Sequence, residues 1–253
     1  MSATIPTTPH LPSHQDQSYP IRMHAGRDGP LSRWLWLVKW LLILPHALLL
    51  IALWIAFSVL SLDALVAIVV TGRYPRSIFD FNVGVLRWSW RVGYYSYNAL
   101  GTDLYPPFTL AEVPGYPAGL EVDYPERLHR GLALVKWLLA IPHLLIVAIL
   151  FSGGVWLSWS AGGDAWSFGG GGVVGVLVLV AAIMLAVTGQ YPQPLFDIIV
   201  GLNRWGLRVA AYTALMTDQY PPFRLDVGSE EPEPGVSTVA SGEPEVRTAT
   251  SSS

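Results

Sequence analysis

The sequence predicts an all-α membrane protein with two tandem repeats, each a transmembrane helical hairpin followed by a cytoplasmic interfacial amphipathic helix. Composition gives the class, because 52% of the 253 residues are hydrophobic and 13% are charged, whereas a soluble chain carries roughly a quarter charged residues. The apolar residues also form blocks long enough to cross a bilayer. The architecture follows from a repeat, because the same motifs occur twice in the same order.

The repeat covers nearly the whole chain. KWLLILPH at 39–46 returns as KWLLAIPH at 136–143, TGRYP at 71–75 as TGQYP at 188–192, and YPPF at 105–108 as YPPF at 220–223. We assign repeat one to residues 19–110, a linker to 111–115 and repeat two to 116–225. The polar stretch 1–18 and the acidic stretch 226–253 are expected to be disordered tails.

The apolar block of repeat one, from Trp34 to Thr71, is long for one span and short for two. Between its Pro-His and Thr-Gly motifs, repeat two is 45 positions long and repeat one 25, so repeat two carries 20 additional, glycine-rich residues. Such a segment cannot lie in hydrocarbon with its backbone groups unsatisfied. We therefore expect a hairpin with an external loop, and by analogy a turn near 58–63 in repeat one. The predicted spans are 34–56, 58–72, 132–151 and 172–189.

The charged residues favour one topology. The basic residues of each repeat fall on one side of its predicted hairpin, and the other side carries only Asp63 and Asp164. By the positive-inside rule, both termini and both amphipathic segments are cytoplasmic. An even number of spans gives both copies the same orientation, related by an axis along the membrane normal. A single long span per repeat would put basic residues on both sides, so we reject it.

One further pattern, FDFNVGVLRW at 79–88, follows the TGRYP motif. Together with RWLWLVKWLLxxPH and YPPF, it resembles a bacterial membrane family, common in actinobacteria, that is catalogued as domain of unknown function 4389. The resemblance covers both copies and implies a multi-pass protein of the bacterial cytoplasmic membrane, but it supplies no reaction or site. Repeat two departs from the pattern where Gln190 replaces Arg73 and Ile199 replaces Asn82. A role requiring the full motif would belong to repeat one.

Each amphipathic segment carries a polar stripe. The two stripes are Asp80, Gly84, Arg87, Arg91 and Tyr95, and the matched Asp197, Gly201, Arg204, Arg208 and Tyr212. Steps of three and four positions place each stripe on one helical face. Arg87, Arg91, Arg204 and Arg208 are candidate binding residues for anionic lipid phosphates, each contributing about 1 kcal/mol at an anionic leaflet. In the alternative, Asp80 and Asp197 cap their helices and pair with an arginine, and the remaining arginines are anchors.

A second candidate set consists of Lys39 with His46 and Lys136 with His143. Each spacing of seven is two helical turns, so each pair shares a face. Lysine can extend to the interface, and polar groups within a membrane are functional candidates. The structural alternative is that each histidine satisfies the carbonyl freed by the preceding proline. The functional one is proton relay or substrate binding. Thr102-Asp103 and Thr217-Asp218 are expected to dock the aromatic YPPF turns against the hairpins.

Other kinds of chemistry are excluded or unsupported. Cysteine is absent, which excludes disulfides, thiol catalysis and cysteine metal sites. One histidine per motif lacks the partners that zinc requires, and no nucleophile elbow, phosphate loop or dinucleotide turn is present. The net charge of −3 carries no signature of nucleic-acid binding. We predict no enzyme activity, no cofactor and no metal.

The predicted function is a non-enzymatic scaffold or anionic-lipid-interacting module of the bacterial cell envelope. Its expected partners are the lipid bilayer, anionic headgroups, and a membrane or cell-wall protein. The external tryptophans Trp156, Trp159 and Trp166 are interpreted as an aromatic belt or as a docking loop for such a partner. The alternative function is a small transporter or transporter subunit, with a pathway between the repeats lined by His46 and His143.

Overall fold

The computed structural model describes residues 19–151 except position 28, the backbone of 156–161 and 164–169, and residues 172–223, 225, 226 and 228. Both repeats lie within one unit, Tyr19–Glu231. The tails predicted to be disordered lie outside the described residues, except for Asp226 and Gly228. The side chains of Trp156, Trp159 and Trp166 also lie outside them, so the predicted aromatic belt stays a prediction.

Repeat one contains one strand and three helices. They are β1 (Ile21–Ala25), α1 (Trp36–Leu42), α2 (Leu44–Thr71) and α3 (Arg76–Tyr95). Pro45 stands in the first turn of α2, where its missing N–H leaves no helical bond unmade. Gly72 ends α2 in the left-handed conformation, with φ of 75°, and its N–H bonds Ile68 O. Pro75 then precedes α3.

The turn predicted near 58–63 is wrong, because these residues lie inside α2. This helix is 28 residues long, which corresponds to about 42 Å. The sequence has no glycine or proline between His46 and Thr71, so no residue interrupts its backbone hydrogen bonds. The predicted spans 34–56 and 58–72 are therefore not a hairpin but α1 and one continuous helix.

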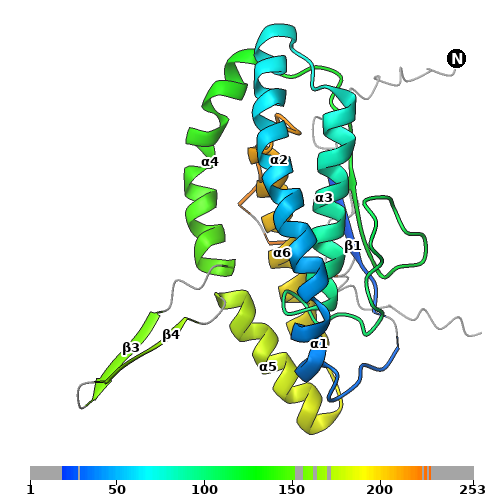
Figure 1. The fold of residues 1–253 in the computed structure, drawn as a ribbon, viewed down its shortest axis with the longest axis vertical. Coiled ribbons are helices and arrows are strands. Elements are labelled where there is room, and N and C mark those ends of the chain that lie inside the picture. Colours follow the sequence, from blue (N-terminus) through cyan, green and yellow to red (C-terminus); the bar gives the residue numbers. More distant parts are fainter. Residues whose placement is uncertain are drawn as a thin grey trace, which may run out of the picture. The chain divides into compact units, whose positions relative to one another are not determined.

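Repeat two repeats this plan with an insertion. Its elements are β2 (Ala118–Val122), α4 (Arg130–Phe151), β3 (Trp156–Ala161), β4 (Asp164–Gly169), α5 (Val173–Thr188) and α6 (Gln193–Thr213). The additional residues form the antiparallel β3–β4 hairpin. Gly172 follows it, directly against the carbonyls of Ile149 and Leu150 at the end of α4, where a Cβ would not fit. Figure 1 shows α5 continuing from the end of α4. The insertion therefore interrupts one helical path, and is not the tip of a helical hairpin as predicted.

The two repeats are related by a two-fold pseudosymmetry. A shift of 97 positions, as from Lys39 to Lys136, maps β1 onto β2. These strands pair antiparallel as a two-stranded ribbon, with Ile21 opposite Val122 and Ala25 opposite Ala118. The two-fold axis therefore passes through this ribbon and is perpendicular to it. The tyrosines of the TGRYP and TGQYP motifs make reciprocal contacts, because Tyr74 donates to Ala214 O at 3.2 Å and Tyr191 to Ala99 O at 2.8 Å. Each repeat thus uses the same surface, as in an isologous dimer.

The equivalent helices run in opposite directions. The start of α4 lies at the end of α2, since Leu128 N donates to Gly72 O at 3.0 Å. Correspondingly, Gly189 at the end of α5 lies against Arg33, just before α1. Equivalent helices that cross a membrane in the same direction, as the predicted orientation of the two copies requires, would be parallel, so this part of the prediction is wrong. It depended on an even number of passes per repeat, and the unbroken α2 removes one.

The elements stack in layers. α2 packs on α3, and α4 and α5 pack on α6, while β2 packs on the other side of α3 and β1 on α6. Figure 1 shows α3 between α2 and β1. The inner face of the ribbon, with Ile21, Met23 and Leu120, joins the buried core of α3 and α6. The α1, α2, α4 and α5 helices form an outer layer, which we call the helical layer.

Candidate functional site

Each YPPF turn is fixed to its repeat by a buried lysine. Lys39 Nζ lies 3.0 Å from Asp103 Oδ1 and donates to Thr102 O at 2.7 Å. Lys136 Nζ makes the same contacts in repeat two, at 2.6 Å to Asp218 Oδ1 and 2.9 Å to Thr217 O. The lysines are buried, so they do not extend to an interface. The Thr-Asp pairs dock the turns, as the sequence predicts, but against α1 and α4 rather than against a hairpin. They do not end the amphipathic helices, which stop earlier, at Tyr95 and Thr213.

The two histidines lie in aromatic clusters formed by these turns. The His46 ring stacks on Phe108 with centroids 3.9 Å apart, and its Nδ1 accepts from Trp88 Nε1 at 3.2 Å. His143 stacks on Phe223 at 3.9 Å and contacts Pro221 O through Nε2 at 3.0 Å. The predicted bonds to carbonyls freed by the preceding prolines are not among these contacts. Each imidazole instead holds the YPPF turn of its own repeat, and the two lie in separate clusters.

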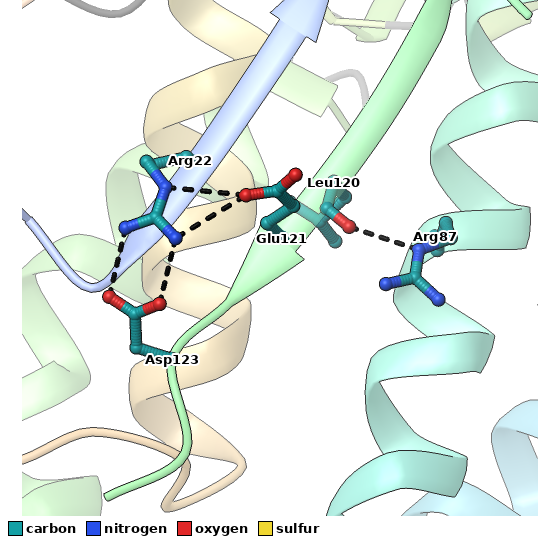
Figure 2. Close-up of polar contacts among 5 residues, drawn as sticks. All are labelled: Arg22, Arg87, Leu120, Glu121 and Asp123. Atoms are coloured by element: carbon teal, nitrogen blue, oxygen red, sulfur yellow. Dashed lines mark hydrogen bonds and ion pairs between the residues drawn. The ribbon is translucent and has the colours of Figure 1, made fainter. Parts of the chain in front are cut away.

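The repeat-one arginines hold the chain that follows the YPPF turn. Arg91 is 1% exposed and donates to Thr109 O through Nη2. Arg87 donates to Leu110 O at 3.4 Å and to Leu120 O at 3.0 Å. Figure 2 shows Arg87 reaching β2 from α3, while Arg22 on β1 binds Glu121 and Asp123. Burial, together with the charge of Arg87, lowers the pKa of Arg91.

The repeat-two arginines are buried in the same way, with one difference. Arg204 donates to Asp226 O at 2.6 Å and Gly228 O at 2.9 Å. Arg208 Nη1 lies 2.6 Å from Asp226 Oδ2, so this arginine has a carboxylate partner. The YPPF copies are 115 positions apart, so Ala111 stands where repeat two has Asp226. Repeat one lacks that carboxylate.

These contacts correct the predicted placement of the amphipathic segments. α3 and α6 are inner helices of the described unit, and Arg91, Arg204 and Arg208 are each 1% exposed, so these arginines do not stand on an exposed face as predicted. The stripe faces the extended chain segments, whose carbonyls accept hydrogen bonds that phosphates or water would otherwise accept. Periodicity therefore identified the face correctly, but not what covers it.

The stripe aspartates do not cap their helices. The N-cap residues are Pro75 and Pro192, without a side-chain cap bond. Asp80 pairs with Arg76 at 3.1 Å on the surface, one helical turn away, an arrangement worth about 0.3–0.5 kcal/mol. Asp197 accepts from Gln193 Nε2 at 2.7 Å. The predicted pairing with an arginine thus holds for Asp80 and not for Asp197.

Sequence reasoning missed two sets of residues. The inter-repeat tyrosines Tyr74 and Tyr191 belong to a repeated motif, and that repetition was a usable signal. Burial raises the pKa of Tyr74 to about 12, and it also raises the pKa of Tyr191. Asp226 gave no signal, because it begins a stretch that reads as a polar tail. Among the described residues, no three His, Asp or Glu side chains come together as a metal site.

A family model described as "Domain of unknown function (DUF4389)" matches residues 33–109 and 169–224, more than half of the chain. The chain belongs to this family. The first DUF4389 match runs from α1 through α3 to the YPPF turn, and the second contains α5, α6 and the second turn. Two copies of the DUF4389 unit therefore stand in tandem, as the sequence predicts. No curated protein and no solved structure matches the chain.

Proposed function

We propose that this chain is a non-enzymatic membrane module of the bacterial cell envelope, held in the cytoplasmic membrane by its helical layer. The observation that carries the proposal is the exposed apolar surface of that layer. Large apolar side chains stand exposed along all of α2, α4 and α5. They include Leu48, Ile51, Ile55, Val59, Leu62, Val66 and Val70, then Leu138, Leu145 and Ile149, then Val176, Leu179, Ile183 and Val187.

Charged residues are nearly missing from the same helices. α1, α2, α4 and α5 contain only four, of which Lys39 and Lys136 are buried, and Asp63 and Arg130 are exposed. Soluble monomers rarely expose apolar patches above a few hundred Å². α2 and α4 are also long and apolar enough to cross a membrane. A lipid environment is the partner that matches this surface.

The pseudosymmetry favours a flat orientation of the helical layer. The two-fold axis passes through the Met23–Leu120 pair, since these positions differ by 97. The neighbouring Arg22, Glu121 and Asp123 therefore lie near mid-length of α2, with side chains 39–52% exposed. If α2 stood upright in a bilayer, these charges would lie at mid-depth, at a cost of at least about 2.5 kcal/mol each.

A flat orientation avoids that cost, because the helical layer enters one leaflet and the ribbon stays in water. The length of α2, about 42 Å, also exceeds a hydrocarbon core of about 30 Å. This arrangement replaces the four predicted spans in our proposal. It keeps the basic residues and both ends of the unit on the cytoplasmic side, as the positive-inside rule requires.

The non-enzymatic part of the proposal rests on how the polar groups are used. Lys39, Lys136 and Arg208 are engaged in ion pairs. Both histidines pack against aromatic rings of their own repeat. These groups hold loops to helices, which supports a scaffold or lipid-organising role.

The test is resistance of the membrane-bound protein to alkaline carbonate extraction, which removes peripheral proteins. We expect the wild-type chain to stay in the membrane fraction. The Val59→Lys/Val66→Lys variant, altered on the exposed face of α2, is expected to lose retention. Glu121→Lys, on the outer ribbon, serves as the matched control and is expected to keep it. Release of the wild-type chain by carbonate would contradict the proposal.

A small transporter is the second candidate. Helical repeats of opposite direction, related by a two-fold axis, are common in secondary transporters, and this observation favours it. In this proposal the repeats stand upright, with a pathway between them that uses His46 and His143. Replacing both histidines by alanine should then abolish a transport phenotype. In a scaffold, the same change should affect function only through the stability of the protein.

A further inference from the structure

Exposed arginines surround a cavity at the C-terminal end of α2. They are separate from the arginine stripes of α3 and α6. The cavity has a volume of about 450 Å³ and is lined by Thr71, Gly72, Arg73, Arg127, Leu128 and Arg130. Its three arginines come from two repeats, because Arg73 follows α2, and Arg127 and Arg130 lead into α4. All three are exposed. We call this the three-arginine pocket.

Within the part of the chain that the structure describes, no carboxylate pairs with an arginine of the three-arginine pocket. Its lining contains no acidic residue. None of the ion pairs among the described residues involves Arg73, Arg127 or Arg130. The neighbouring Glu126 likewise takes part in none of these pairs. Three like charges around one cavity repel one another, and an anion in that cavity removes the repulsion.

The pocket borders the apolar surface of the helical layer. Thr71 is the last residue of α2 and follows Val70, which is 66% exposed. Leu134 stands one helical turn after Arg130, on the same face, and is 61% exposed. An anionic group in the pocket would therefore lie beside surface suited to hydrocarbon. Guanidinium groups match phosphate oxygens with two parallel hydrogen bonds.

We propose that the three-arginine pocket binds the phosphate of an anionic lipid headgroup, with the acyl chains along Val70 and Leu134. This inference rests on the proposed function for the presence of lipid. It moves the predicted lipid contact away from Arg87, Arg91, Arg204 and Arg208 to arginines that face solvent. The guanidinium groups of Arg87, Arg91 and Arg204 already bind backbone carbonyls, and that of Arg208 binds the Asp226 carboxylate. The chemistry that recognises the ligand is a phosphate group carrying net negative charge.

The pseudosymmetry supplies an internal comparison. At the equivalent end of α5, Gln190 and Pro30 stand in place of Arg73 and Arg127, and Arg33 in place of Arg130. The cavity there, of about 220 Å³, is lined by Arg27, Pro30 and Gln190, and Arg33 lies against Gly189 of its lining. Arg27 is already engaged, because it donates to Gln193 Oε1 at 2.6 Å. One chain thus has one complete pocket and one incomplete one. We expect one tightly bound anionic lipid per chain.

Native mass spectrometry of the full chain in mild detergent, with added phosphatidylglycerol, tests this. Each arginine near an anionic lipid contributes about fivefold in affinity, so Arg73→Gln/Arg127→Gln/Arg130→Gln should bind it on the order of 100-fold more weakly. Arg22→Gln, on the ribbon, is the control and should bind like wild type. Equal lipid retention by the triple variant and the wild type would overturn the proposal.

A second variant tests the pocket by gain of binding. Pro30→Arg/Gln190→Arg completes the cluster around Arg33 and should raise the number of bound phosphatidylglycerol molecules from one to two. Unchanged stoichiometry in this folded variant would count against the proposal. Binding of phosphatidylcholine and competition by inorganic phosphate identify which kind of molecule supplies the bound phosphate. Equal binding of phosphatidylcholine excludes selection of anionic lipid, and displacement of the lipid by millimolar phosphate assigns the pocket to a soluble ligand.

This experiment fails independently of the proposed function. Lipid binding is measured in detergent, whereas membrane anchoring is measured by carbonate extraction of membranes. A chain that resists carbonate but binds no phosphatidylglycerol keeps the membrane module and loses the pocket. A chain that carbonate releases, but that binds phosphatidylglycerol in detergent, keeps the pocket and loses the flat anchor.

Discussion

Replacing Asp226 by alanine should destabilise repeat two more than any other single substitution near its arginines. Arg208 is 1% exposed, and its Nη1 lies 2.6 Å from the Asp226 carboxylate. Removing one partner of a buried ion pair costs about 3–5 kcal/mol, because the remaining charge stays desolvated. Since a native protein has only about 5–15 kcal/mol of stability, Asp226→Ala should lower the urea midpoint markedly. The assay is urea unfolding in mild detergent, monitored by circular dichroism.

Two further variants separate the charge from other effects. Arg208→Met/Asp226→Ala removes both charges and should recover most of the loss, because apolar groups of similar size replace a buried pair at little cost. Ala111→Asp supplies repeat one with the carboxylate that Arg91 lacks, and should stabilise the chain by about 1 kcal/mol. If Asp226→Ala lies within about 0.5 kcal/mol of wild type, the buried-pair reasoning is refuted.

Three other predictions concern pH, packing and the insertion. The folded pKa of Tyr74, about 12, exceeds its unfolded value of about 10, so its stabilising contribution is complete below pH 10 and declines between pH 10 and 12; Tyr74→Phe should lack this decline in urea midpoints. His46→Ala should cost about 2–4 kcal/mol in unfolding free energy by leaving a cavity beside Phe108, whereas His46→Phe should cost less. Deleting 152–171 should leave α4 and α5 as one helix, with unchanged helical circular dichroism and a melting temperature within about 4 °C of wild type.

The repeat and the family could be predicted from the sequence, because long motifs identify both. The uninterrupted course of α2 was not predicted. The glycines of the insertion suggest a hairpin in repeat two and, by analogy, in repeat one, although the sequence between His46 and Thr71 has no glycine or proline. The absence of helix-breaking residues was the stronger signal. An insertion can leave a helical path as a projecting hairpin without reversing it.

The ribbon was also missed, for a different reason. β1 and β2 are five residues each, with polar outer residues, and they read as polar approaches to the apolar blocks. Their pairing joins Met23 to Leu120 across most of repeat one, and no local pattern encodes such a distant partner. The same holds for the arginine stripes. Spacing placed Arg87 and Arg91 on one face, but only the fold brings the 109–111 segment over that face.

The sidedness of the two ends of α2 tests the flat membrane orientation most directly. The chain has no cysteine, so Arg33→Cys before α1 and Arg73→Cys after α2 can each be probed with a membrane-impermeant maleimide, with Val59→Cys as the lipid-facing control. In the flat arrangement, both ends react in inverted membrane vesicles and neither reacts in intact spheroplasts. Labelling of one end from outside and of the other from inside would mean that α2 crosses the membrane, and would contradict the account.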